Sequence, residues 1–130
     1  MSEQLDSFRL VQRHHTTAVV VELHGEFDVL SAASLDTCLH ALTSVPDRDV
    51  VVDLRPATFI DCSTLGVLCG AHQRLRTDGR RLQVVVTRPL TLRVLRLLRL
   101  DHTFRVLDTW PPSGREANGR ITGTSRTSHC

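Results

Sequence analysis

The chain has 130 residues, 41% of them hydrophobic, and a formal net charge of +2. This length predicts a single domain with its own core, and the charge is too small to indicate nucleic-acid binding. No apolar run reaches the roughly 20 residues of a membrane-spanning helix, and the N-terminal segment lacks the apolar region of a secretory signal. The four cysteines form no C-x-x-C pair, so no disulfide framework is expected and the reducing cytoplasm is favoured.

The first part of the chain predicts two strands followed by a helix. Alternating apolar residues in 17–24 are typical of a strand, and a weaker strand is expected at 7–12. From Ser31 to Leu42 the apolar residues repeat with helical spacing, and either Ser31 or Asp28 can cap that helix. These elements are expected to begin an alternating α/β fold.

The second part of the chain continues the alternation. The apolar run at 49–54 suits a strand covered on both faces, and 82–87 predicts another. A helix lies between these strands, and a further helix is expected from Pro89 to about Leu100. Residues 105–108 can form a last short strand, so the whole pattern is typical of the α/β class.

A short loop is expected at 55–58, after the strand at 49–54, and it leads to the stretch FIDCSTLG, residues 59–66, where the second helix starts. Phe59 and Ile60 are expected in the core, and Asp61 or Ser63 can cap the helix. In open α/β sheets, functional residues gather beyond the carboxyl ends of strands. A phosphate on Ser63 would carry about −1.5 to −2 charges, which the start of a helix tolerates but a docked partner would not. The stretch therefore predicts a surface switch.

Three stretches of the chain resemble the STAS-domain family of bacterial anti-sigma-factor antagonists, and the likeness extends over about residues 8–109. ELHGEFDVLSAASL is similar to the family's strand-to-first-helix segment, and PLTLRVLRLLRLDHTFRV is similar to its closing helix and strand. VVVDLRPATFIDCSTLGVL resembles its most specific signature, in which a serine follows an aspartate by two positions. The resemblance implies an α/β, STAS-like single domain over 1–110, with a mixed sheet of four to five strands flanked by three to four helices. The small polar residues of 111–130 predict a flexible tail.

The resemblance also implies a phosphorylation-controlled binding switch without catalysis or cofactors of its own. Its unphosphorylated form would bind an anti-sigma factor with serine kinase activity and so free a sigma factor. Phosphorylation at Ser63 would release that partner, and a serine phosphatase would reset the switch in the cytoplasm. The kinase would bring ATP and Mg²⁺. The family pattern implies these partner-binding residues: Asp28, Asp61, Cys62, Ser63, Thr64 and Leu65. Cys62 and Thr64 stand where many members have serine and glycine, and Thr64 could offer a competing hydroxyl.

Two alternatives to a phosphorylation-controlled antagonist also describe a signalling domain. It could be a STAS module of a larger signalling assembly that is never phosphorylated. It could also be a phospho-aspartate receiver with Asp53 as acceptor, but a receiver needs a lysine near its last strand and all sixteen basic residues here are arginine. Asp53 is instead expected to make local hydrogen bonds at a strand end.

Two further alternatives use other residues. An enzyme built on Ser63 or Cys62 would need a neighbouring base, and His72 lies on an apolar helix stripe where a packed residue is expected. The arginines of the third helix could bind a membrane or nucleic acid. We expect instead a solvated basic face, with the leucine and valine face packed on the sheet. That expectation concerns Arg93, Arg96 and Arg99 on one side, and Leu90, Val94, Leu97 and Leu98 on the other.

Overall fold

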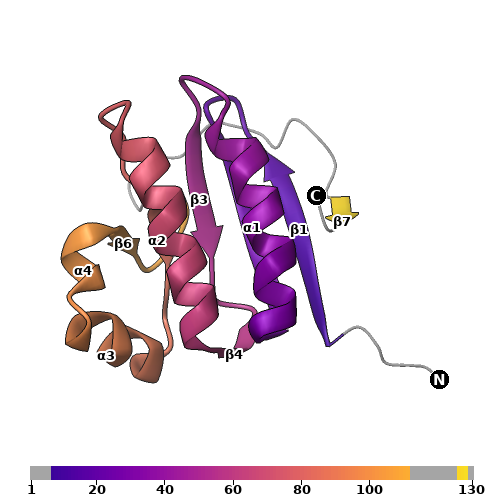
Figure 1. Ribbon diagram of the computed structural model, residues 1–130, viewed down its shortest axis with the longest axis vertical. Coiled ribbons are helices and arrows are strands. Elements are labelled where there is room, and N and C mark those ends of the chain that lie inside the picture. The colour runs from indigo at the N-terminus through magenta and orange to yellow at the C-terminus, as the bar shows by residue number, and fades with distance from the viewer. Residues whose placement is uncertain (1–6, 112–125, 129–130) are drawn as a thin grey trace.

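The computed structural model describes residues 7–111 and 126–128. In these residues seven strands form one sheet, and α1 and α2 lie side by side across one of its faces (Figure 1). The strands are β1 (Phe8–His14), β2 (Ala18–Phe27), β3 (Asp49–Asp53), β4 (Ala57–Ile60), β5 (Gln83–Val85), β6 (Arg105–Leu107) and β7 (Arg126–Ser128). The helices are α1 (Val29–Thr43), α2 (Cys62–Arg76), α3 (Pro89–Leu97) and α4 (Leu100–Thr103). None of the described helices is long and apolar enough to span a bilayer.

The sheet is mixed, as expected, and its strand order is β6-β5-β3-β2-β1-β7, with β4 also pairing with β2. β2 runs antiparallel to β1 and parallel to both β3 and β4. The α/β class is confirmed, but the sheet has more strands than the four or five expected. A loop was expected at 55–58, but β4 begins at Ala57. Most of the tail expected at 111–130 lies outside the described residues, but β7 falls within it and pairs antiparallel with β1.

The core lies between the sheet and the two helices α1 and α2. Val50, Val51 and Val52 of β3 are all fully buried, so this strand is covered on both faces as its apolar run predicted. Val50 and Val52 belong to the main core, whereas Val51 packs in a smaller cluster on the opposite face with Leu107 and Trp110. The main core fixes α1 and α2 against the strands whose ends carry the candidate site.

Gly25 makes the end of β2 possible. Its φ is +95°, and a Cβ at this position would lie 2.1 Å from the carbonyl oxygen of Ser7. The pairing of β2 with β4 is irregular between Gly25 and Glu26, which is typical of a bulge. The last residues of β2 can therefore pair with β4 after the earlier ones have paired with β3.

The region predicted as one helix from Pro89 to about Leu100 is divided. α3 ends at Leu97, and Arg99 has a left-handed backbone with φ of 63° before α4 begins. The expectation that Leu90, Leu97 and Leu98 pack on the sheet is wrong, because all three are exposed. Leu95 is the buried residue of this helix. Both sides of α3 carry leucine, so spacing alone did not show which side would be covered.

The cysteines differ from the expectation that none would pair. Cys38, buried on α1, is disulfide-bonded. Cys62 and Cys69 are free thiols on α2, and Cys62 is exposed. Only Cys62 therefore offers an exposed thiol near the start of α2.

Candidate functional site

Two helices begin at the same edge of the sheet. β2 ends at Phe27 and β4 ends at Ile60, and these two residues are partners in the parallel ladder. The residue after each strand is an aspartate that caps a helix: Asp28 caps α1 and Asp61 caps α2. The backbone N–H of Asp61 donates to the carbonyl oxygen of Phe27 at 3.1 Å, so the two helix starts are joined directly.

Asp61 organises the start of α2. Its Oδ1 accepts the backbone N–H of Thr64 at 3.2 Å and the Ser63 hydroxyl at 2.5 Å. The side-chain oxygen of a capping residue satisfies a backbone donor that the helix itself leaves unpaired. Asp61 therefore explains the cap, and Ser63 is not needed for it.

Ser63 and Thr64 differ in accessibility although they are neighbours. Ser63 is the second residue of α2 and is partly exposed, with its hydroxyl donating only to Asp61. Thr64 is the third residue and is fully buried, with its hydroxyl donating to the carbonyl oxygen of Phe27 at 3.2 Å. Leu65 is also buried. The Thr64 side chain therefore cannot contact a partner as the sequence suggested, and it offers no accessible hydroxyl to a kinase. Leu65 keeps only a small exposed fraction and lines a groove on the other side of the helix start.

The start of α1 has a reciprocal cap. Asp28 accepts the backbone N–H groups of Leu30 at 3.0 Å and Ser31 at 3.2 Å, while its own N–H donates to the Ser31 hydroxyl. The Ser31 hydroxyl donates to the carbonyl oxygen of Glu26 and is almost completely buried. Ser31 is thus a structural residue, and Asp28 is the exposed polar residue of this corner.

Both capping carboxylates are held in their charged form. The backbone N–H of Ser31 lowers the pKa of Asp28, with its hydroxyl adding to the effect. The hydroxyl of Ser63 is the main cause that lowers the pKa of Asp61, and the backbone N–H of Thr64 contributes. The corner is therefore anionic at neutral pH.

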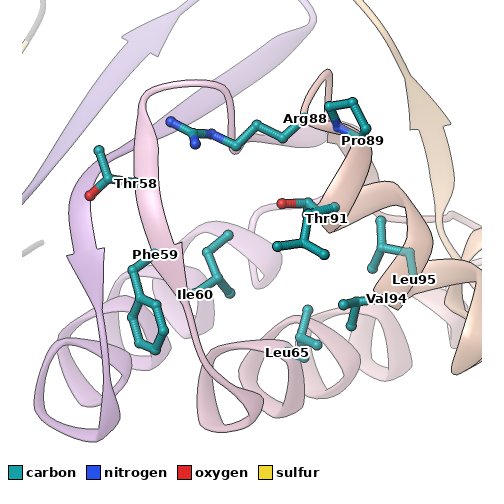
Figure 2. A pocket seen from close by; sticks show the side chains of 10 residues that line it. Thr58, Phe59, Ile60, Leu65, Arg88, Pro89, Thr91, Val94 and Leu95 are labelled. Carbon is teal, nitrogen blue, oxygen red and sulfur yellow. The ribbon is translucent and has the colours of Figure 1, made fainter.

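Exposed apolar side chains surround these carboxylates, and the sequence reasoning missed them. Val29 and Leu30 at the start of α1 are 66% and 80% exposed. Phe59 of β4 is 53% exposed, so its expected place in the core is wrong, whereas Ile60 does pack against the core. Figure 2 shows Phe59 and Ile60 pointing to opposite sides of the strand. The four residues of β4 show little alternation between buried and exposed positions, so no signal in the sequence revealed the exposure of Phe59. We call this region the Ser63 surface; it comprises Asp28, Val29, Leu30, Phe59, Asp61, Cys62 and Ser63.

Comparison with known proteins identifies the family of this fold. The family model described as STAS domain matches residues 9–111, which is most of the chain. The chain belongs to the STAS domain family. A curated relative, anti-sigma-F factor antagonist RsfB of Mycobacterium tuberculosis, is 26% identical over 104 residues, which cover 80% of this chain and 84% of RsfB.

Solved structures of STAS domain proteins share the fold. The crystal structure of an anti-sigma factor antagonist from Mycobacterium paratuberculosis matches with a TM-score of 0.74 and 27% identity, covering 84% of this chain and 92% of that one. The phosphorylated form of SpoIIAA, a Bacillus cell fate determinant, matches with a TM-score of 0.59 and 19% identity, covering 76% of this chain and 89% of that one. The second likeness shows the fold alone.

The receiver alternative finds no support in this STAS domain. Asp53 is buried at the end of β3, and both of its carboxylate oxygens accept hydrogen bonds from the Arg55 guanidinium, at 2.9 and 2.8 Å. Its Oδ1 also accepts the backbone N–H of Arg55 at 3.0 Å. These are the local hydrogen bonds at a strand end that the sequence predicted for Asp53.

The residues considered for an enzyme do not assemble around Ser63. His72 is buried, accepts the backbone N–H of Leu82 at 3.3 Å and packs edge-on against Phe104. Burial raises the pKa of the Cys69 thiol, which opposes nucleophilic reactivity. No group of three metal-ligating side chains exists among residues 7–111 and 126–128.

Proposed function

We propose that this STAS domain is an anti-sigma-factor antagonist whose binding is controlled at Ser63. The unphosphorylated chain binds an anti-sigma factor with serine kinase activity and so frees a sigma factor. The observation that carries this proposal is the partly exposed Ser63 hydroxyl at the start of α2, beside a hydroxyl at Thr64 that is sealed in the core. The relationship to RsfB, an anti-sigma-F factor antagonist, supports the same class of partner.

Phosphorylation acts on the interface more than on the fold. A phosphate on the second residue of a helix lies near unpaired backbone N–H groups and the positive end of the helix dipole, which contributes about 1 kcal/mol or less. Like charges brought together at an interface cost several kcal/mol. The ester also removes the proton that Ser63 donates to Asp61, and leaves that carboxylate beside a dianion. The phosphorylated chain therefore stays folded and releases its partner.

The composition of the Ser63 surface describes the partner. Asp28 and Asp61 are anionic at neutral pH, and Leu30 and Phe59 expose large apolar side chains on the same surface. Such a surface fits a partner that presents basic side chains around an apolar patch. Phe59 is the aromatic anchor of this contact, because aromatic residues dominate interface energies.

The remaining components come with the partners. The anti-sigma factor supplies ATP and Mg²⁺, a serine phosphatase removes the phosphate, and the antagonist contributes no catalytic group, nucleic-acid contact or membrane contact. We place this cycle in the cytoplasm. Because disulfides seldom persist there, the Cys38 disulfide would be reduced in that compartment, with Cys38 remaining packed in the core.

Phosphorylation with the candidate kinases of the same genome tests the proposal. The chain is incubated with each anti-sigma factor, ATP and Mg²⁺, and the modified residue is identified by mass spectrometry. We expect phosphate on Ser63, retained binding by Ser63→Ala and strongly reduced binding by Ser63→Asp, with both variants folded. Thr64→Val is the matched control and should be phosphorylated like the wild type. Phosphate on Asp53 or Thr64 contradicts the proposal. A partner that binds without ever modifying Ser63 would make the chain an unphosphorylated STAS module.

A further inference from the structure

A groove lies next to the Ser63 surface, between β4 and α3, and Phe59 lines its edge. The proposed function uses Phe59 but not the rest of the groove. The groove has a volume of about 330 Å³. In Figure 2, Ile60 of β4 and Leu65 of α2 face Val94 of α3 across it. Leu65 lies two residues after Ser63 on α2, so the groove reaches the first turn of the helix that carries Ser63. We call this feature the α3 groove.

The α3 groove continues along an exposed apolar stripe. Leu90, Val94 and Leu97 are spaced i, i+4 and i+7, which places them on one side of α3. Leu90 and Val94 line the groove, while Leu90 and Leu97 are 72% and 75% exposed. Exposed leucines continuous with an apolar groove mark an interaction site. The stripe is as long as two helical turns, which suits a helix laid along it.

Unpaired positive charge borders the groove. Arg88 precedes α3 and lines the groove, with its side chain extending from the start of α3 toward β4 (Figure 2). Arg93 is next to both Leu90 and Leu97 on the helix surface, at spacings of three and four residues. Among the described residues, neither guanidinium has a hydrogen-bond or ion-pair partner. An occupant of the groove would therefore gain from carboxylates on either side of its apolar residues.

We propose that the α3 groove is a second docking site, which receives an acidic amphipathic helical segment of the anti-sigma factor. Apolar side chains of that segment fill the space between Ile60, Leu65 and Val94, and its carboxylates face Arg88 and Arg93. This inference rests on the proposed function, because it assigns the groove to the same partner. The two sites differ in charge: the Ser63 surface is anionic and the α3 groove is cationic. This opposition fixes the orientation in which the partner docks.

Affinity measurements with the unphosphorylated chain test the apolar part of this site. The probe is the anti-sigma factor that phosphorylates Ser63, titrated calorimetrically into wild type and into the double variant Leu90→Ser/Leu97→Ser. Both leucines are exposed, so the variant should keep the wild-type circular dichroism and urea midpoint. We expect its Kd to rise about tenfold or more. Val45→Ser, which alters an exposed apolar residue at the far end of α1, should bind like the wild type. A double variant with a Kd within twofold of wild type overturns the inference.

Charge reversal tests the acidic character of the occupant. Arg88→Glu/Arg93→Glu should weaken binding and reduce its dependence on salt concentration, whereas Arg105→Glu, an exposed arginine on β6, should do neither. Equal effects from the control variant would contradict an acidic segment. A wild-type chain that forms a dimer in sedimentation experiments, and loses it in the leucine variant, would assign the groove to a second copy and overturn the inference.

The failure of either proposal gives a different result. If the partner phosphorylates Ser63 and releases the product, but binds every groove variant like the wild type, only the groove inference fails. If the folded wild-type chain binds no anti-sigma factor of its genome, the proposed function fails and the groove inference fails with it.

Discussion

The starts of α1 and α2 both pair a capping aspartate with a serine, but the serine is buried at α1 and partly exposed at α2. Each helix begins with a capping aspartate that accepts a backbone N–H and has a serine hydroxyl within hydrogen-bond distance of its Oδ1. At α1 the serine is Ser31, the third helical residue, which is 1% exposed. At α2 it is Ser63, the second helical residue, which is partly exposed. The third residue of α2 is Thr64, and it is buried just as Ser31 is.

The difference shows that position within the first turn decides the role of a hydroxyl. The third residue of each helix points toward the end of β2, where Ser31 donates to the carbonyl oxygen of Glu26 and Thr64 donates to that of Phe27. The second residue points outward, and at α1 this position is occupied by the exposed Leu30. A hydroxyl at the third position therefore stabilises the fold, and one at the second position is available to another protein.

Placing a charge at each serine should give the largest contrast. Ser31→Asp buries a second carboxylate beside Asp28 without a cationic partner, so we expect unfolding to become easier by about 3 kcal/mol or more. Ser63→Asp lies at the surface near the helix dipole and should change the free energy of unfolding by less than about 1 kcal/mol. Urea unfolding at pH 7 measures both. Similar losses for the two variants would refute the distinction between the helix starts.

Removing each hydroxyl of α2 should give a smaller contrast. Thr64→Val keeps the shape of the buried side chain but loses its hydrogen bond to Phe27, and should cost about 1 kcal/mol. Ser63→Ala loses a hydrogen bond at the surface and should stay within about 0.5 kcal/mol of wild type. The same unfolding assay compares them. A larger cost for Ser63→Ala would show that Ser63 is chiefly structural.

His72 should make the free energy of unfolding depend on pH between pH 7 and 5. Burial lowers the pKa of His72, and the charges of Arg76 and Arg81 add to the effect. The unfolded chain therefore binds more protons, and the stability contributed by neutral His72 is present above about pH 6.5 and is lost as the pH falls through the lower folded-state pKa. His72→Gln should flatten the slope of unfolding free energy between pH 7 and 5. An unchanged slope would contradict a neutral buried His72.

The smallest expected effect is a shift in the pKa of one capping aspartate, Asp61, without a shift in that of the other, Asp28. The pKa values of Asp28 and Asp61 are lowered in the folded state, so their stability is fully present above about pH 4 and is lost as the pH falls through the folded-state values. Asp61 depends chiefly on the Ser63 hydroxyl, and Asp28 on the Ser31 backbone. Ser63→Ala should therefore raise the pKa of Asp61, measured by carboxyl NMR, and leave that of Asp28 unchanged. A shift at Asp28 would show that the two starts titrate together.

Much of the candidate site could be predicted from the sequence. The alternating strands and helices predicted Asp28 at the end of a strand and Asp61 at the start of the second helix. The parallel pairing of β2 with β4, which joins these two positions, was not predicted. Burial within the first turn of α2 could not be predicted, because nothing in the sequence shows which of Ser63, Thr64 and Leu65 has an exposed side chain. Only the backbone direction at the cap separates the exposed hydroxyl from the buried one.

The errors in the fold have physical causes. β4 is short and joins β2 through an irregular pairing, so its four residues show little of the alternation that identifies a strand. α3 carries leucine on two sides, and the side with Leu95 faces the core while the side with Leu90 faces solvent. Hydrophobic periodicity finds such a helix but does not tell which of its sides the rest of the protein will cover.

The position of Ser63 in the first turn of α2 has an evolutionary consequence. One added codon between Asp61 and Ser63 would move the serine to the place now held by Thr64, facing inward. The regulation proposed here would therefore be lost by a change of one residue in length, without loss of the serine, the aspartate or the fold. Among related chains, a conserved spacing between the aspartate and the serine is therefore a better sign of retained regulation than the presence of both residues.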